Sequence, residues 1–445
     1  MAHARAAAVG VLLLTALLVP TGDVEARTAI VKAGEGWRLE VDGKPYVAKG
    51  VTFSGSGGPS NFDQDCARLS AVGVNTLRTW GTGEETAALL DAAHKHGLRV
   101  LVGLWLRPGR PGMENDDAFD YVRDAKGREA QLQATLKQVR RFKNHPAVLA
   151  WGLGNEVILN SPDDASKVAY ARFLEKVVRA VKKADAEHPV LSVDAWTLGV
   201  PFWEKYAPSL DAYGLNVYGR GIHALPEAVK QAGGRKPWFI TEFGAQGEWE
   251  APKDAQGLRI EPGDGEKYDV IVDGWRNALG PQVQAGRCLG LFVFNYSASF
   301  DHTGLWLGML SGTSTRPAWH AVREAYTGRK PQPPLPVPVR LSVRGVEKDG
   351  AATWALVDFE VSAPAGAPLE VSFAYNFRGA ATREARDGVT TLESRKGAAP
   401  GSWRVRLPAV AGAFKLYGLA KDGAGNLVAA TTSVAPAAGV APSSP

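Results

Sequence analysis

Eight short apolar runs, separated by segments with helical periodicity, constrain this chain more than any other feature. The runs are nearly continuous in hydrophobicity rather than alternating, as expected for parallel strands that are buried on both faces. They span Tyr46–Phe53, Val74–Trp80, Arg99–Leu106, Val148–Val157, Pro189–Trp196, Ala212–Tyr218, Pro237–Phe243 and Cys288–Tyr296. Eight strand-then-helix units in about 300 residues predict an α/β fold, the closed (β/α)8 TIM barrel.

The segments between the runs support this prediction. Apolar residues recur at helical spacing in Glu84–His96, Glu129–Lys143, Ala165–Lys183, Ala224–Gln231 and Pro317–Tyr326. A doubly wound open sheet is the alternative. It usually has fewer strands and carries a Gly-x-Gly-x-x-Gly turn, which the glycines at 55, 57 and 58 do not form.

The pattern changes at a proline-rich stretch, residues 330–338, which we interpret as an extended linker. Beyond it, turn signals separate short strand-like segments: Ala352–Val361, Leu369–Phe377, Trp403–Leu407, Phe414–Leu419 and Leu427–Ser433. About 100 residues of this kind predict a small immunoglobulin- or fibronectin-like β-sandwich. The predicted boundaries are therefore 27–329 for the barrel, 339–434 for the sandwich and 435–445 for a disordered tail.

The first 26 residues resemble a secretory signal peptide. Arg5 precedes an apolar stretch, 9–19, that is too short to cross about 30 Å of hydrocarbon, and small residues follow near Ala26. We therefore expect a periplasmic or secreted protein without stable membrane insertion after cleavage. Two cysteines, Cys66 and Cys288, exclude a disulfide scaffold and a cysteine-based zinc module, while their own pairing stays open.

The charge balance argues against a nucleic-acid partner. The chain has 51 Lys and Arg against 46 Asp and Glu, and no basic run concentrates the excess of five. No phosphate-binding loop and no metal-ligand spacing stands out either. We expect neither a cofactor nor a bound metal.

Polar residues end most of the apolar runs, and in a barrel of this type the active site is built at those ends. Polar groups there are costly unless they face a cavity. The candidates for binding a ligand are Arg78, Trp80, Trp105, Asn155, Trp196, Asn216, Tyr218, Tyr296 and, in the last loop, Trp306. The tryptophans offer indole faces that could stack on sugar rings, although each could instead fill the top of the barrel.

Two carboxylates stand out among these strand ends. Glu156 follows the fourth run and Glu242 the seventh, so their side chains can converge across the barrel mouth. Glycosidic cleavage requires such a pair, one protonated acid and one ionised nucleophile or base. Arg78 is a candidate for keeping one of them ionised, because a nearby cation favours the charged form.

The sequence around these carboxylates resembles a known group of enzymes. Residues 151–157 (Trp-Gly-Leu-Gly-Asn-Glu-Val) and 238–244 (Trp-Phe-Ile-Thr-Glu-Phe-Gly) resemble the two catalytic signatures of the retaining glycoside hydrolases of clan A. The entire segment 30–328 is most similar to the barrels of families 2 and 5. Residues 154–157 also resemble the acid/base motif of β-1,3-glucanosyltransferases.

The resemblance implies roles for individual residues. Glu156 would be the general acid/base and Glu242 the nucleophile, with Tyr218 and Arg78 beside it, and Asn155 would bind the sugar 2-hydroxyl. It also implies retention at β-linked glycosides, with carboxyl groups about 5–5.5 Å apart. A β-glucan transglycosylase would use the same residues. A non-catalytic glycan-binding envelope protein is the alternative from another class.

Overall fold

The structure is a computed structural model that describes residues 27–110, 118–297, 303–364, 367–377, 388–410 and 412–435. The predicted signal peptide and all but the first residue of the predicted tail lie outside these ranges. Within them, no helix is both long and apolar enough to cross a membrane.

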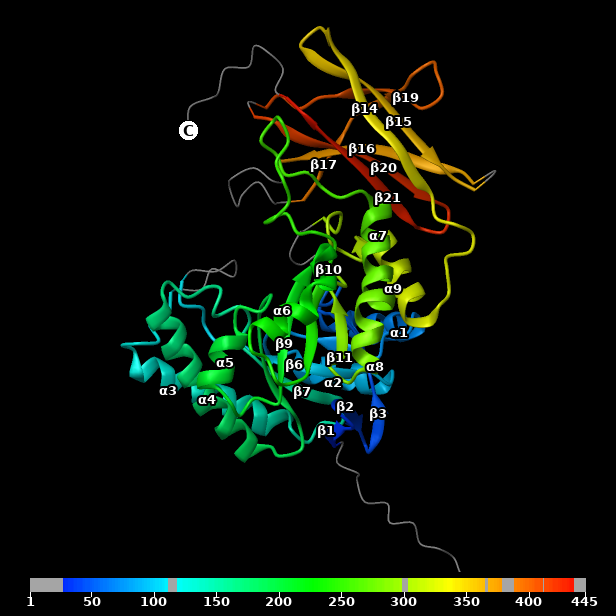
Figure 1. The fold of residues 1–445 in the computed structure, drawn as a ribbon. Coiled ribbons are helices and arrows are strands. Elements are labelled where there is room, and N and C mark those ends of the chain that lie inside the picture. The colour runs from blue at the N-terminus through cyan, green and yellow to red at the C-terminus, as the bar shows by residue number, and fades with distance from the viewer. Residues whose placement is uncertain are drawn as a thin grey trace, which may run out of the picture.

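Within the described ranges, eight parallel strands close into a barrel, one for each apolar run (Figure 1). The strands are β4 (Ala48–Thr52), β5 (Thr76–Arg78), β6 (Arg99–Leu104), β7 (Val148–Leu153), β8 (Val190–Ala195), β9 (Ala212–Tyr218), β10 (Trp238–Gly244) and β11 (Cys288–Val293). β11 pairs with β4 and closes the barrel. Nearly every residue of these strands is buried, which is why their sequences are apolar throughout. The predicted fold class is confirmed.

Helices surround the barrel, and the sequence predicted several of them. They are α1 (Phe62–Ala71), α2 (Thr86–Lys95), α3 (Ala125–Phe142), α4 (Asp164–Ala184), α5 (Val200–Tyr206), α6 (Leu225–Gln231), α7 (Asp264–Asp273), α8 (Gly280–Gln284) and α9 (Pro317–Thr327). A π-helical turn, Gly274–Leu279, joins α7 to α8, and 3-10 turns occupy Pro59–Asn61 and Gly219–His223. The sequence prediction missed α1, α5 and α7–α8. α5 has only seven residues, too few for a long apolar periodicity, and α1 buries a polar residue, Asp65, among its apolar ones.

A small antiparallel sheet closes the N-terminal end of the barrel. It consists of β1 (Thr28–Ala33), β2 (Gly36–Val41) and β3 (Lys44–Tyr46), which lie at the base of the barrel in Figure 1. Leu39 and Val41 of β2 pack against inward-facing barrel residues such as Leu101 and Phe239. The barrel is therefore sealed at this end, which leaves the ends of the strands opposite for a site.

Two four-stranded sheets follow the barrel and pack face to face, as the second half of the fold prediction requires. One sheet contains β14 (Val337–Asp349), β15 (Ala352–Ser362), β19 (Ser402–Arg406) and β18 (Ser394–Lys396), and the other β17 (Thr390–Leu392), β16 (Leu369–Asn376), β20 (Phe414–Asp422) and β21 (Leu427–Val434). β14 begins at Val337, inside the stretch interpreted as a linker. Pro338 is tolerated there because β14 is an edge strand, where a missing N–H costs little. A short hairpin, β12 (Leu310–Ser311) and β13 (Ser314–Thr315), precedes α9.

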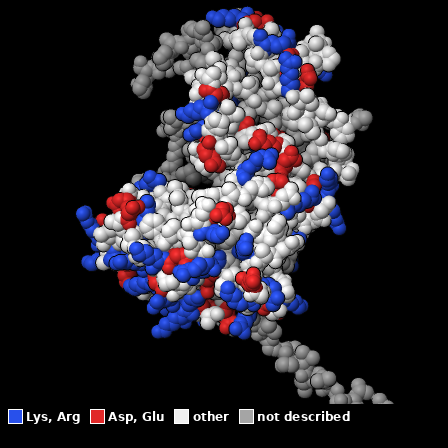
Figure 2. All heavy atoms as spheres, viewed as in Figure 1, with Lys and Arg blue, Asp and Glu red and all other residues white. Residues whose placement is uncertain are grey.

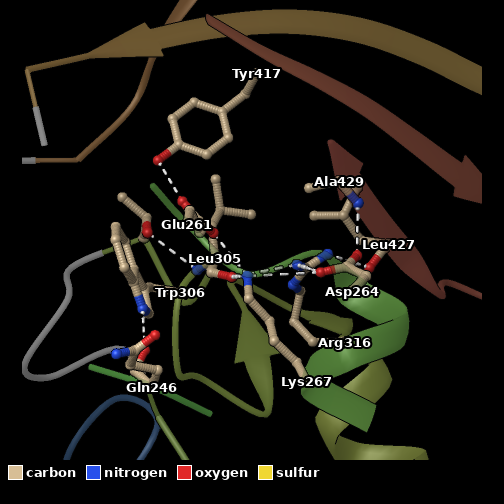
Figure 3. A network of polar contacts seen from close by, with 11 residues as sticks. Gln246, Glu261, Asp264, Lys267, Leu305, Trp306, Arg316, Tyr417, Leu427 and Ala429 are labelled. Atoms are coloured by element: carbon tan, nitrogen blue, oxygen red, sulfur yellow. Dashed lines mark hydrogen bonds and ion pairs between the residues drawn. The ribbon is translucent and has the colours of Figure 1, made fainter. Parts of the chain in front are cut away.

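Barrel and sandwich meet at a buried ionic cluster, which we call the seam. It consists of two acidic and two basic residues of the barrel part, each at most 8% exposed: Glu261, Asp264, Lys267 and Arg316. Lys267 Nζ lies 2.6 Å from Glu261 Oε1, and Arg316 Nη2 lies 2.6 Å from Asp264 Oδ1 (Figure 3). Each charge therefore has an opposite charge in direct contact.

The sandwich contributes neutral partners to the seam. Tyr417 donates its hydroxyl to Glu261 (2.9 Å), the backbone N–H of Ala429 donates to Asp264 (2.7 Å), and Arg316 donates to the carbonyl of Leu427 (2.5 Å) (Figure 3). Lys267 and Arg316 also donate to the carbonyl of Leu305 (2.6 and 3.3 Å). The seam thus ties one sheet of the sandwich, through β20 and β21, to the loop that precedes β12.

The structure also bears on two features considered in the sequence, the pairing of the two cysteines and the distribution of surface charge. Cys66 and Cys288 are both buried, unpaired thiols, which resolves the question of their pairing. On the face shown in Figure 2, Lys and Arg are interspersed with Asp and Glu rather than gathered in one basic surface.

Candidate active site

The polar ends of β5, β7, β9 and β10 meet at the C-terminal end of the barrel. We call the group that they form the mouth cluster; its members are Arg78, Asn155, Glu156, Asn216, Tyr218 and Glu242. The pairing of neighbouring strands brings these residues together: Glu242 of β10, for example, lies opposite Asn216 of β9. The sequence predicted all six as site residues.

Glu242 is held by three donors and is 6% exposed. Arg78 Nη1 and Trp80 Nε1 each donate to its Oε1 at 2.8 Å, and the hydroxyl of Tyr218 donates to its Oε2 at 2.7 Å. Arg78, itself 1% exposed, also donates to the carbonyl of Thr241 (2.9 Å), which fixes the guanidinium. A buried cation and two neutral donors stabilise the ionised form of this carboxylate.

Glu156 lies in a different environment. Among the described residues, its carboxyl accepts a hydrogen bond from Asn216 Nδ2 at 2.9 Å. Burial and, after it, the negative charge of Glu242 raise the pKa of Glu156 to about 8. This carboxyl is therefore protonated at neutral pH, whereas Glu242 has the partners that favour its charge.

Two asparagines connect the carboxylates. Asn155 Oδ1 accepts from Arg78 Nη2 (2.7 Å) and from Asn216 Nδ2 (3.2 Å), and Asn216 Oδ1 accepts from Thr241 Oγ1 (2.8 Å). The carbonyl oxygen of Asn155 is thus occupied within the cluster. Its NH2 group is the part that could donate to a ligand.

The predicted aromatic residues divide into two groups. Trp80 donates to Glu242 as described, and its ring packs edge-on against Phe294 (centroids 5.9 Å apart). Trp105 and Trp196 are half-buried at the ends of their strands, with Trp105 beside Gly81 and Trp196 beside Gly221. These three tryptophans belong to the barrel mouth.

Tyr296 and Trp306 are buried and face other partners. Tyr296 stacks on Phe53 and donates its hydroxyl to Asp65 (2.8 Å). Trp306 is 1% exposed, and its indole N–H donates to the carbonyl of Gln246 (2.9 Å). Both rings are buried, and Trp306 shares an apolar cluster against which Trp80 and Tyr218 pack. The sequence places both residues after the eighth strand, but the packing of α1 and of the loop after β10 decides which way they face.

Sequence reasoning missed Trp249, in the loop after β10. Its indole is 43% exposed and meets the ring of Tyr218 edge-on, with centroids 4.8 Å apart. Gly247 lies under this indole, where a Cβ would approach the ring to 2.2 Å, so only glycine fits. The short spacing Gly-x-Trp was the available signal, but exposure cannot be read from a single tryptophan.

Within the described ranges, no group of three or more His, Cys, Asp or Glu side chains is arranged to hold a metal ion. The chemistry that the mouth cluster can perform is proton transfer and nucleophilic attack by its two carboxyl groups.

Comparison with known proteins agrees with this geometry. Residues 59–248, which include both glutamates, match the model of the glycosyl hydrolases family 2 TIM barrel domain. A β-glucuronidase of Pongo abelii is 29% identical over 202 residues, which are 41% of this chain and 26% of that protein. The resemblance inferred from the two motifs is confirmed.

Solved structures give the same fold. The Bacteroides uniformis β-glucuronidase 2, covalently bound to cyclophellitol-6-carboxylate aziridine, superposes with a TM-score of 0.50 at 16% identity, over 92% of this chain and 48% of that one. The FMN-binding β-glucuronidase from Facaelibacterium prausnitzii L2-6 gives 0.50 at 12% identity, over 93% and 59%. The chain therefore spans about a quarter of the curated relative and about half of these structures.

Proposed function

We propose that this protein is a retaining glycoside hydrolase that cleaves β-linked oligo- or polysaccharides with Glu242 as nucleophile and Glu156 as general acid/base. The observation that carries the proposal is the contrast between the two carboxyl groups. Glu242 accepts hydrogen bonds from Arg78, Trp80 and Tyr218, whereas burial holds the pKa of Glu156 at about 8. A carboxylate held by three donors beside a carboxyl with a raised pKa can serve as nucleophile and acid.

The reaction would proceed in two displacements. In the first, Glu242 attacks the anomeric carbon while Glu156 gives its proton to the glycosidic oxygen, so the leaving sugar departs as an alcohol and a glycosyl ester of Glu242 remains. In the second, Glu156, now ionised, takes a proton from water as the water oxygen attacks the anomeric carbon. The ester bond breaks, Glu242 regains its charge and Glu156 its proton.

The environment of each residue suits its step. Arg78 and Tyr218 contact the Glu242 oxygens that bear charge before attack and after release. The NH2 group of Asn155 is the natural donor to a sugar hydroxyl, because its oxygen is held by Arg78. Trp249, exposed beside Tyr218, offers a stacking surface for a second sugar, which favours an oligosaccharide over a single glycoside.

A panel of substrates tests the proposal and defines the sugar. It should contain β-1,3-, β-1,4- and β-1,6-linked oligosaccharides and, because the relatives are named β-glucuronidases, aryl β-glucuronides beside aryl β-glucosides and β-galactosides. Shorter products released first as the β-anomer support the proposal. Products longer than the substrate identify a transglycosylase, in which a sugar hydroxyl replaces water. Binding without turnover on every substrate would favour the non-catalytic alternative.

Trp249→Ala tests the stacking surface. We expect KM for an oligosaccharide to rise about tenfold while an aryl monoglycoside is affected little. Trp249→Phe is the matched control, because it retains a ring. Equal changes for both substrates would contradict a second sugar site at Trp249.

The cellular location is also a proposal. The basic, apolar and small-residue order of residues 1–26 supports export, which places the enzyme in the periplasm or outside the cell. Sequencing the N-terminus of the mature protein from culture fractions tests it, and a retained Met1 in the cytoplasm would refute it.

A further inference from the structure

Asp194, near the end of β8, is a fully buried carboxylate (0% exposed) that accepts three backbone N–H groups. Its Oδ2 accepts from Ile158 at 2.7 Å, and its Oδ1 accepts from Leu159 at 3.1 Å and from Ala195 at 2.9 Å. Two of these donors belong to the loop after β7, and the third precedes Trp196. One side chain therefore ties the loop after β7 to the end of β8, where a second loop of the barrel mouth begins.

The first of these loops contains Glu156, whose backbone is left-handed with φ of +53°. An L-residue in this region costs about 1–2 kcal/mol, so the conformation persists only where the surroundings enforce it. The N–H of Glu156 donates to the carbonyl of Val193 (3.0 Å), and Asn160 donates twice to the carbonyl of Glu156 (2.9 Å each). Asp194 fixes the turn between these two attachments.

The second loop begins at Trp196, which is also left-handed, with φ of +51°. Its N–H donates to the carbonyl of Asn216 (2.9 Å), the residue whose side chain bonds Glu156. Asp194 thus lies between two strained residues of the mouth and is hydrogen-bonded on both sides. The three N–H donors use both carboxylate oxygens of Asp194, which a side chain with a single acceptor oxygen does not offer.

Burying a carboxylate in this place is costly. Burial raises the pKa of Asp194 to about 7, opposed by its three N–H donors and by Lys167. The charge of Asp194 in turn raises the pKa of Glu156. Asp194 therefore affects Glu156 through the backbone and through its charge.

We propose that Asp194 is a positioning residue for the general acid/base: by pinning the turn after Glu156, it holds the Glu156 carboxyl where it can protonate the glycosidic oxygen. The inference rests on the proposed function. It predicts an effect confined to steps in which Glu156 transfers a proton.

Leaving groups of different acidity test this, because a poor leaving group needs the proton from Glu156 and an activated one does not. Asp194→Asn turns an NH2 group toward at least one of the N–H donors. We expect kcat/KM to fall about 10- to 100-fold for aryl β-glycosides with poor leaving groups and to change little for a dinitrophenyl glycoside.

Asp185→Asn is the matched control. Asp185 is a second buried carboxylate, 4% exposed, at the C-terminal end of α4. It accepts from the indole N–H of Trp151 (2.7 Å) and the N–H of Glu187 (2.9 Å), and its Oδ2 lies 2.8 Å from His188 Nδ1. Its substitution should lower stability without altering the dependence on the leaving group. If kcat/KM depended on the acidity of the leaving group in the same way in wild type, Asp194→Asn and Asp185→Asn, the inference would be overturned. The proposed function would remain intact.

A double-mutant cycle separates positioning from a general loss of structure. In Glu156→Ala, azide attacks the glycosyl ester of Glu242 and forms a glycosyl azide, so Glu156 is no longer needed. Adding Asp194→Asn to Glu156→Ala should then leave the azide-dependent rate unchanged. A further drop equal to that in the wild-type background would show that Asp194 does not act through Glu156.

Folding must be monitored in parallel by circular dichroism. Asp194→Ser, which keeps one acceptor oxygen, serves as the second variant if Asp194→Asn is unfolded. Unfolding of both while Asp185→Asn folds would make Asp194 a residue of the fold and overturn its assignment. Absence of wild-type turnover on all substrates would overturn the proposed function, and this inference with it.

Discussion

The mouth cluster and the seam are two buried ionic clusters in one chain, and they differ in charge balance. In the seam, Glu261 and Asp264 face Lys267 and Arg316, so each carboxylate contacts a cation. In the mouth cluster, two glutamates share one cation, Arg78, and it contacts Glu242. The uncompensated glutamate, Glu156, has a pKa raised to about 8 by burial and by Glu242.

The difference shows how the same side chains serve either structure or chemistry. A balanced buried cluster fixes geometry, because removing any member leaves an unpaired charge. An unbalanced one keeps a proton on its weakest acid and can deliver it. The seam joins two parts of the fold, and we propose that the mouth cluster transfers protons and glycosyl groups.

The largest effect should come from Glu242→Gln in the mouth cluster. The amide can still accept from Arg78 but cannot form the glycosyl ester, so turnover should fall by at least about 10⁴-fold. Circular dichroism and a thermal melt should show an intact fold. A variant with wild-type kcat would refute the assignment of the nucleophile.

In the seam, Arg316→Met should cost stability rather than turnover. It leaves Asp264 buried with only Lys267 (3.7 Å) as a cation, and the expected loss is about 3–5 kcal/mol in the free energy of unfolding. Arg38→Met, which removes an exposed ion pair with Glu40, is the control and should cost no more than about 1 kcal/mol. Equal losses in denaturant titrations would contradict the comparison.

Two tyrosines allow a paired test of smaller effects. Tyr218→Phe removes a donor to Glu242 and should lower kcat/KM about 10²-fold with little change in stability. Tyr417→Phe removes a donor to Glu261 and should lower the free energy of unfolding by about 1–2 kcal/mol with little change in kcat/KM. If both variants lost the same property, the two clusters would not have separate roles.

The smallest effect concerns pH. Glu156 must be protonated to act as an acid, so kcat/KM should show a basic limb that falls tenfold for each pH unit above its pKa of about 8. The charges of Glu242 and Asp194 raise the pKa of this carboxyl, whereas the hydrogen bond from Asn216 and the charge of Arg78 lower it. A basic limb near the ordinary pKa of a glutamate, measured on a substrate with a poor leaving group, would contradict the environment described here.

Several elements followed from local patterns in the sequence. Continuous apolar runs predicted that all eight barrel strands are buried, because a strand that is covered on both faces has no polar side. Glu156 and Glu242 were located as polar residues ending such runs. The sheet β1–β3 and helix α1 escaped prediction because their burial depends on the barrel that they cover.

Local patterns thus sufficed to predict the barrel with its eight strands, the sandwich that follows it, and Glu156 and Glu242 at the ends of two strands. Tertiary contacts were needed to see that Arg78, Trp80 and Tyr218 all donate to Glu242, that Tyr296 and Trp306 are buried, and that Trp249 is exposed. They also decided that the sandwich completes the seam. The physical reason is that periodicity records how deeply a residue is buried, whereas the partners of a side chain depend on which distant loops the closed barrel brings together.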